Sequence, residues 1–139
     1  MKKLLKITLL IFLFSNSLDA KNFYLEEGIK LFENKKFKEA KFKFEKELVF
    51  NPKSELAYLY LSKIFKNLDK KNLQEQNLNT VILLNPKNEI AIFNLAKLKL
   101  ESSDYKKSAD LNKKLISICV KFCDKSNKLK IEIENLLKK

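Results

Sequence analysis

The chain has 139 residues, of which 45% are hydrophobic and 33% charged, and its net charge is +12. This length suits one small domain. The chain has no histidine, no tryptophan and no arginine, so all 29 of its basic residues are lysine. The commonest general base is therefore missing, as is the planar guanidinium that recognises phosphate and guanine. These absences argue against an enzyme and against a sequence-reading DNA-binding protein, and we expect no cofactor.

The first twenty residues differ in composition from the rest. Two lysines follow Met1, an apolar run extends from Ile7 to Phe14, and small and polar residues lead to Ala20. This order predicts a secretory signal peptide over residues 1–20. The alternative is an uncleaved membrane anchor. The apolar run is shorter than the roughly 20 residues that span a bilayer, which favours the signal peptide. Because no cysteine near the junction could accept a lipid, we expect a soluble exported protein, periplasmic or secreted.

The lysines are spread along the whole chain and alternate with glutamates. Removal of residues 1–20 takes away three lysines and one aspartate, which leaves a net charge of +10. Because this charge is not gathered in one block, we interpret it as a solvated surface and expect no nucleic-acid partner. A weak attraction to anionic membrane surfaces stays open.

Two prolines reveal a repeat in the rest of the chain. Pro52 and Pro86 lie 34 residues apart, and each is the middle residue of an Asn-Pro-Lys sequence that follows an apolar run. Gly28 is the only glycine, and no stretch alternates in the manner of a β-strand, so we expect helices. A 34-residue period in a helical chain is typical of stacked helix-turn-helix units. The sequence therefore predicts an all-α solenoid that serves as a binding scaffold.

The first unit has large and small residues at characteristic places. An aromatic residue is followed four positions later by a small one in the first helix, and an aromatic, an alanine and a second aromatic follow in the second helix. These residues are Tyr24, Gly28, Phe37, Ala40 and Phe44. With Pro52 at its end, the unit closely resembles a tetratricopeptide repeat (TPR). The small residues let two antiparallel helices approach closely, and the aromatics fill the space around the contact.

The pattern continues with the same period and weaker matches, such as Tyr58 and Ser62 in the second unit. Val120 stands where a third proline should end its unit, so we expect the preceding helix to continue beyond it and to break near residues 124–126. The remaining residues predict one amphipathic helix that caps the stack, with a partner-binding tail as the alternative.

The predicted division is a signal peptide over 1–20 and a TPR-like domain over 21–139, with about three repeats (21–54, 55–88, 89–122) and a capping helix (126–139).

The resemblance implies a protein partner and a place to bind it. In TPR proteins the first helices of successive units line a concave groove, and the matching places here are apolar with a lysine flank. Exposed apolar groups along one face usually mark a binding surface. We therefore expect a peptide or an amphipathic helix with apolar anchors and some acidic residues as the ligand; the alternative is a groove partly filled by the protein's own side chains. The groove residues are Leu25, Ile29, Phe32, Leu56, Leu59, Lys63, Lys66, Ile90, Phe93, Lys97 and Leu100.

One activity of the family is not supported by the matching residues. Chaperone-adaptor TPR domains hold the carboxylate end of a partner with lysine, asparagine and arginine side chains. Only one of the matching places here is polar, so we expect no capture of a free carboxylate end. These places hold Leu25, Ile29, Tyr60, Ile90 and Asn94.

Cys119 and Cys123 are the last candidates for chemistry. Their spacing is not that of a thioredoxin motif, and a zinc site would need two more Cys or His ligands, so we expect no metal. On an unbroken helix the two side chains would lie one turn apart with nearly parallel directions, which is poor geometry for a disulfide. Two buried thiols and a disulfide across a broken helix end therefore both stay open.

Two functional hypotheses follow from these observations. The first is a non-enzymatic interaction module of a bacterial cell envelope that binds another protein in its groove. The second is a structural or accessory subunit of an envelope assembly complex that docks through its outer surface.

Overall fold

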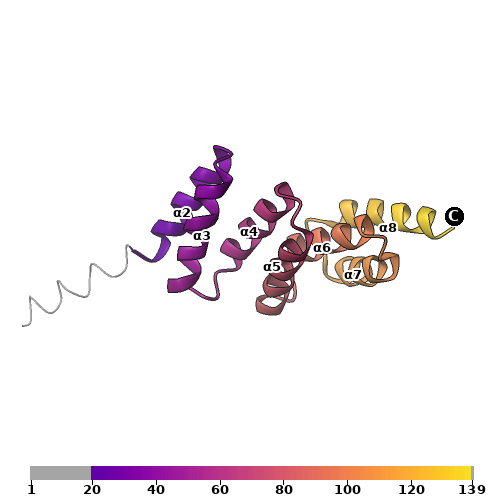
Figure 1. Cartoon of the computed structure of the whole chain (residues 1–139). Helices are drawn as coiled ribbons and strands as arrows, with labels where there is room; N and C mark the ends of the chain where they lie inside the picture. Colours follow the sequence, from indigo (N-terminus) through magenta and orange to yellow (C-terminus); the bar gives the residue numbers. More distant parts are fainter. Residues whose placement is uncertain (1–19, 139) are drawn as a thin grey trace, which may run out of the picture. The chain divides into compact units, whose positions relative to one another are not determined.

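The computed structural model describes residues 20–138, and in this range the chain forms helices joined by turns, with no β-strand. The predicted signal peptide, apart from Ala20, lies outside the described residues. Helices follow one another along the chain with short connections between them (Figure 1). They are α2 (Ala20–Glu33), α3 (Phe37–Phe50), α4 (Glu55–Asn67), α5 (Lys71–Leu84), α6 (Glu89–Glu101), α7 (Tyr105–Ile118) and α8 (Cys123–Leu137).

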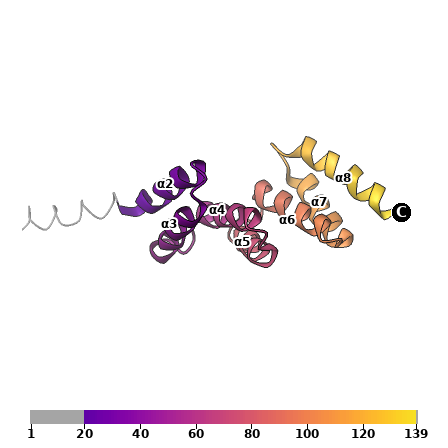
Figure 2. The same cartoon turned by 45° about the horizontal axis from the view of Figure 1, so that its top comes forward.

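The chain forms two compact units, one up to Tyr60 and one from Leu61. In the first unit α2 packs against α3. In the second unit α6 packs against both α5 and α7, and α8 packs against α7 and more lightly against α6. Figure 2 shows these neighbouring helices from a second direction. The pairs α2–α3, α5–α6, α6–α7 and α7–α8, whose members follow one another in the sequence, are therefore packed against one another.

The turns inside the helix pairs recur with the period of the sequence. Lys35, Asp69 and Ser103 lie 34 residues apart and have left-handed φ angles of 58°, 51° and 60°. In each turn the following residue donates its N–H to a carbonyl five residues earlier, with a donor–acceptor distance of 2.9 Å. This is the Schellman arrangement, which satisfies the last carbonyl groups of a helix. The three turns thus share one backbone geometry although none contains glycine.

Close contact between α2 and α3 organises the first unit. Ala40 and Phe44 are fully buried, and a Cβ atom placed on Gly28 would lie 2.8 Å from Cε1 of Phe44. The Phe44 ring also stacks on the Tyr60 ring, with their centroids 5.0 Å apart. The prediction that the small residue at 28 marks the helix contact is confirmed, and Ala40 is buried, as a residue at such a contact must be.

Glu47 is buried in α3 although it carries a carboxylate. Its side chain is 1% exposed. Oε1 accepts a hydrogen bond of 3.3 Å from Nδ2 of Asn51, whereas Oε2 has no partner in the described part of the chain. One and two periods later the chain has Val81 and Leu115, which are both fully buried. Position 47 therefore belongs to the core, and a carboxylate that is only partly hydrogen-bonded is costly there.

The connection between α7 and α8 differs from the prediction. The helix before Val120 does not continue past it, because α7 ends at Ile118. The next helix, α8, begins at Cys123, three residues earlier than predicted. The backbone N–H groups of residues 120–122 bond to a side chain of α6 instead of to α7 carbonyls. In this unit the hydrogen bonds to the α6 side chain end α7, whereas a proline ends the earlier units.

Candidate functional site

The predicted groove residues are divided between the two compact units. Leu59 and Leu100 are 5% and 7% exposed, so they belong to the core and present little surface to a ligand. Leu56 and Ile90 are 42% and 40% exposed, and the other predicted residues are exposed or half-buried. The first unit holds Leu25, Ile29, Phe32, Leu56 and Leu59, and the second holds Lys63, Lys66, Ile90, Phe93, Lys97 and Leu100.

The burial of Leu100 has a clear cause. It belongs to an apolar cluster with Ala96 of α6 and with Leu129 and Ile133 of α8. The C-terminal helix therefore covers this end of α6, and the assignment of Leu100 to an open groove is corrected.

A small cleft between α6 and α8 contains two of the predicted groove residues. Phe93 and Lys97 of α6 line a cavity of about 160 Å³. The Phe93 ring meets the Phe122 ring edge-on, with centroids 5.4 Å apart. Nζ of Lys125 lies 4.4 Å from the Phe122 centroid and 6.0 Å from the Phe93 centroid. The remaining wall is formed by α8 and consists of Lys125, Lys128, Leu129 and Glu132. We call this the α6–α8 cleft; it combines an apolar floor with a lysine-rich rim.

The contribution of α8 to this cleft was missed by sequence reasoning, although a signal was present. The helices α4, α6 and α8 begin at Glu55, Glu89 and Cys123, which lie 34 residues apart. By this register α8 is the first helix of a fourth unit rather than a helix outside the repeat. Extending the period beyond Val120 would have placed the α8 lysines beside the third unit.

Glu89, the first residue of α6, holds the segment between α7 and α8. Its Oε1 accepts a hydrogen bond of 2.9 Å from the N–H of Val120, and its Oε2 accepts bonds of 3.0 Å from Lys121 and 2.8 Å from Phe122. Desolvation raises the pKa of Glu89, but the three hydrogen bonds and the charge of Lys121 outweigh this effect. The pKa of Glu89 therefore lies below its ordinary value.

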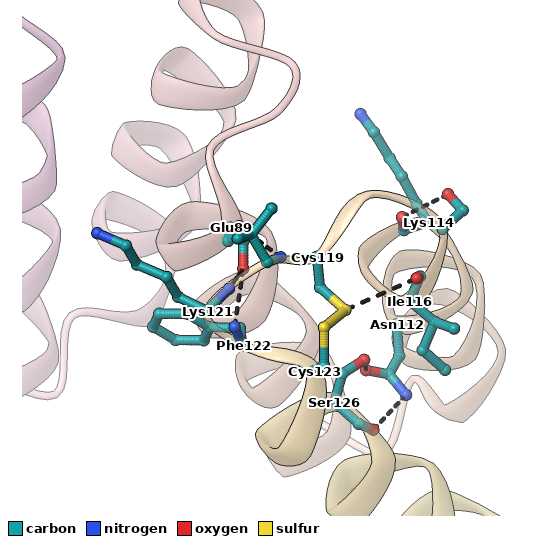
Figure 3. Close-up of a disulfide and its surroundings, with 11 residues drawn as sticks. Glu89, Asn112, Lys114, Ile116, Cys119, Lys121, Phe122, Cys123 and Ser126 are labelled. Atoms are coloured by element: carbon teal, nitrogen blue, oxygen red, sulfur yellow. Dashed lines mark hydrogen bonds between the residues drawn. A yellow bond between two sulfur atoms is a disulfide. The ribbon is translucent and has the colours of Figure 1, made fainter.

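A disulfide spans the same segment. Cys119 and Cys123 are bonded, with their Cα atoms 5.3 Å apart (Figure 3). Because α7 ends before Cys119, the two side chains are free of the parallel arrangement that a continuous helix would impose. Of the two alternatives left open by the sequence, the structure has the disulfide at a broken helix end.

A buried polar pair joins α7 to α8 and was not foreseen. Nδ2 of Asn112 donates to the backbone oxygen of Ser126 at 3.0 Å, and the hydroxyl of Ser126 donates to Oδ1 of Asn112 at 2.7 Å (Figure 3). The two residues are 2% and 0% exposed. By the period, Asn112 takes the place of Phe44, so this interface is fixed by hydrogen bonds where the first unit uses an aromatic ring.

Within residues 20–138 there is no group of three or more His, Cys, Asp or Glu side chains arranged to hold a metal ion. No helix in this range combines the length and the apolar character needed to cross a bilayer.

Comparisons with known proteins establish the fold. No protein-family model and no curated protein matches the chain, but solved structures do. The first TPR domain of Spaghetti (RPAP3), bound to an HSP90 peptide, is 16% identical with a TM-score of 0.76; the match covers 86% of this chain and 94% of that one. The TPR2B domain of yeast Sti1, in complex with pHsp70, is 12% identical with a TM-score of 0.76, covering 84% and 97%.

A bacterial structure is similar to the same extent. The type III secretion chaperone SycD of Yersinia enterocolitica, in complex with a peptide of the translocator YopD, is 12% identical with a TM-score of 0.78. The match covers 87% of this chain and 96% of that one. The chain is thus an all-α protein with the helical-hairpin repeat fold of TPR domains, and the predicted fold class is confirmed.

Proposed function

We propose that this protein is a non-enzymatic interaction scaffold that binds a peptide or an amphipathic helix of another protein. The observation that carries this proposal is the α6–α8 cleft, in which the predicted residues Phe93 and Lys97 meet the lysines of α8. The fold supports it, because the RPAP3 and SycD structures hold an HSP90 peptide and a YopD peptide. The lack of histidine in the whole chain supports a role without catalysis.

The side chains of the cleft favour a particular ligand chemistry. The apolar floor of the cleft can supply most of the binding free energy when an apolar side chain of the ligand is buried against it, because a few buried contacts dominate such interfaces. Lys97, Lys125 and Lys128 surround this floor with only Glu132 to oppose them. Because opposite charges steer association and fix orientation, the preferred ligand combines an apolar anchor with nearby acidic residues.

We propose further that the protein acts in a bacterial cell envelope after export. Residues 1–20 support this by their signal-peptide pattern. The Cys119–Cys123 disulfide supports it as well, because disulfides persist in oxidising compartments. The native protein should begin near Lys21 and be found in the soluble envelope fraction. An intact mass that retains Met1, together with resistance to extraction from membranes, would show an anchor instead.

Charge reversal in the cleft tests the binding proposal. The double variant Lys125→Glu/Lys128→Glu alters two exposed side chains and should keep the helical content of the wild type. We expect it to lose the partner that the wild-type protein captures by crosslinking in its own envelope fraction. The matched control is Val49→Asp, a change at a residue of α3 that is 75% exposed. Equal capture by the wild type and the double variant would refute a ligand in this cleft.

A second candidate function is favoured by the exposed side of α3. Phe42, Val49 and Phe50 are 54%, 75% and 69% exposed, and Nζ of Lys46 lies 4.8 Å from the Phe42 centroid. Such a surface suits an accessory subunit of an envelope complex that docks through its outer face. The same capture experiment separates the two functions, because partner loss in Val49→Asp and retention in Lys125→Glu/Lys128→Glu would favour docking through α3.

A further inference from the structure

A second cleft lies between α7 and α8 and uses residues outside the predicted groove. Its volume is about 430 Å³. Ile116 of α7 and Leu137 of α8 are 41% and 59% exposed, so apolar surface is accessible on both sides. The full lining consists of Ala109, Asn112, Lys113 and Ile116 of α7 and of Lys130, Ile133, Glu134 and Leu137 of α8. We call this the α7–α8 cleft.

The repeat register shows what kind of element fits this cleft. In the first unit Gly28 of α2 faces Phe44 of α3. In the third unit the carbonyl of Ala96 of α6 accepts a hydrogen bond of 2.8 Å from the hydroxyl of Ser108 of α7. Lys130 is the residue of α8 at the same place, 34 positions after Ala96, and it lines the cleft. The cleft is therefore on the face of α8 against which the second helix of a unit packs.

We infer that the α7–α8 cleft is a docking site for an acidic amphipathic helix of another protein, which takes the place of the second helix of the fourth unit. This inference goes beyond the proposed function, because it concerns a different surface. In the described part of the chain no helix follows α8. In helix-in-groove recognition the bound helix places apolar side chains, spaced one turn apart, on an apolar surface of its partner. The exposed side chains of Ile116 and Leu137 provide such a surface here.

The charges of the cleft specify an acidic helix. Lys130 stands where the earlier units have Gly28 and Ala96, so a docking helix meets an ammonium group there. Lys113 adds a second cation from α7, against Glu134 as the anion of the lining. Nζ of Lys130 and Oε1 of Glu134 are 3.9 Å apart, and both side chains are more than half exposed. Because such a surface pair is weak, Lys130 can exchange Glu134 for a carboxylate of the incoming helix.

A synthetic peptide provides the probe for this site. It has the sequence of α7, residues 105–118, because α7 packs on the corresponding face of α6. Its four lysines are replaced by glutamate, and the unaltered α7 peptide serves as the basic control. Fluorescence anisotropy with the full chain should show saturable binding of the acidic peptide. The basic peptide should bind at least about tenfold more weakly, because its lysines are repelled by Lys113 and Lys130 of the cleft.

Matched protein variants locate the peptide. Ile116→Glu/Leu137→Glu should weaken binding at least about tenfold, because it removes the apolar anchoring surface. The control Ile131→Glu changes a residue of α8 that is 59% exposed and does not line the cleft, and it should bind like the wild type. Lys130→Glu, an exposed change that leaves the apolar surface intact, should reverse the preference between the two peptides. Circular dichroism verifies that each variant keeps the helical content of the wild type.

Three results would overturn this inference. The first is no saturable binding of the acidic peptide to the wild type. The second is weaker binding in Lys125→Glu/Lys128→Glu but not in the Ile116 and Leu137 variant, which would assign the peptide to the α6–α8 cleft and leave the proposed function standing. The third is a wild-type dimer in sedimentation velocity that Ile116→Glu/Leu137→Glu converts to a monomer, because the occupant would then be a second copy of this chain.

Discussion

Replacing Gly28 by alanine tests how closely α2 and α3 must approach. The added methyl group would lie 2.8, 3.0 and 3.1 Å from Cε1, Cδ1 and Cζ of Phe44, well inside the optimum of about 3.5–4.0 Å for carbon atoms. The ring has little room to move, because it is fully buried and stacked on Tyr60. Overpacking of this kind costs about 1–3 kcal/mol, whereas alanine is better than glycine in a helix by roughly 1 kcal/mol. We expect a net loss of up to about 2 kcal/mol in the free energy of unfolding.

Phe44→Leu supplies the background that separates these two effects. Leu78 is fully buried at the equivalent place of the second unit, so leucine is compatible with the fold, and its smaller volume relieves the contact with residue 28. Phe44→Leu destabilises by itself because it leaves a cavity. In that background Gly28→Ala should stabilise the protein by up to about 1 kcal/mol. Urea denaturation of all four proteins, followed by circular dichroism, measures this double-mutant cycle. The same effect of Gly28→Ala in both backgrounds would refute the close-contact explanation.

Three further predictions concern other buried or hydrogen-bonded groups. Glu47→Leu should raise the free energy of unfolding by about 1–3 kcal/mol, because it removes a carboxylate with an unbonded buried oxygen; a lower urea midpoint would contradict this. Asn112→Ala should lower it by about 1–3 kcal/mol, because the Ser126 hydroxyl loses its buried acceptor, and adding Ser126→Ala should recover part of the loss. The folded state lowers the pKa of Glu89, so its stabilising contribution is present above the ordinary pKa and is lost as the pH falls through the lower folded value. Glu89→Gln should therefore flatten the acid side of the pH–stability profile, and an unchanged profile would refute the role of its three hydrogen bonds.

The helix pairs could be predicted because their signals are local. Gly28 and Ala40 mark the contact of two helices within one unit, and Pro52 and Pro86 each end a unit, so each signal can be recognised within its own repeat unit. The end of α7 could not be predicted in this way, because it depends on Glu89, a residue 31 positions away from Val120 in the sequence.

The candidate site was predicted in part for the same reason. Phe93 and Lys97 could be found from their place in the repeat, and both line the α6–α8 cleft. Leu100 was wrongly assigned to the groove, because its position in the repeat gives no information on α8, which packs over it. Asn112 and Ser126 are polar in sequence, and only the packing of α7 on α8 makes them a buried pair.

The packing of consecutive helices in four pairs has a consequence for how the chain folds. The pairs α2–α3, α5–α6, α6–α7 and α7–α8 form by closing short segments of chain. Contact order is low in such an arrangement, which is typical of rapid folding, and a nucleus can form at any hairpin and grow outward. The entropy of long-loop closure is therefore largely avoided. Within the second unit we expect α8, which packs on α7 and only lightly on α6, to open and re-form locally while the α6–α7 pair stays folded, so that α8 exchanges its amide hydrogens before that pair.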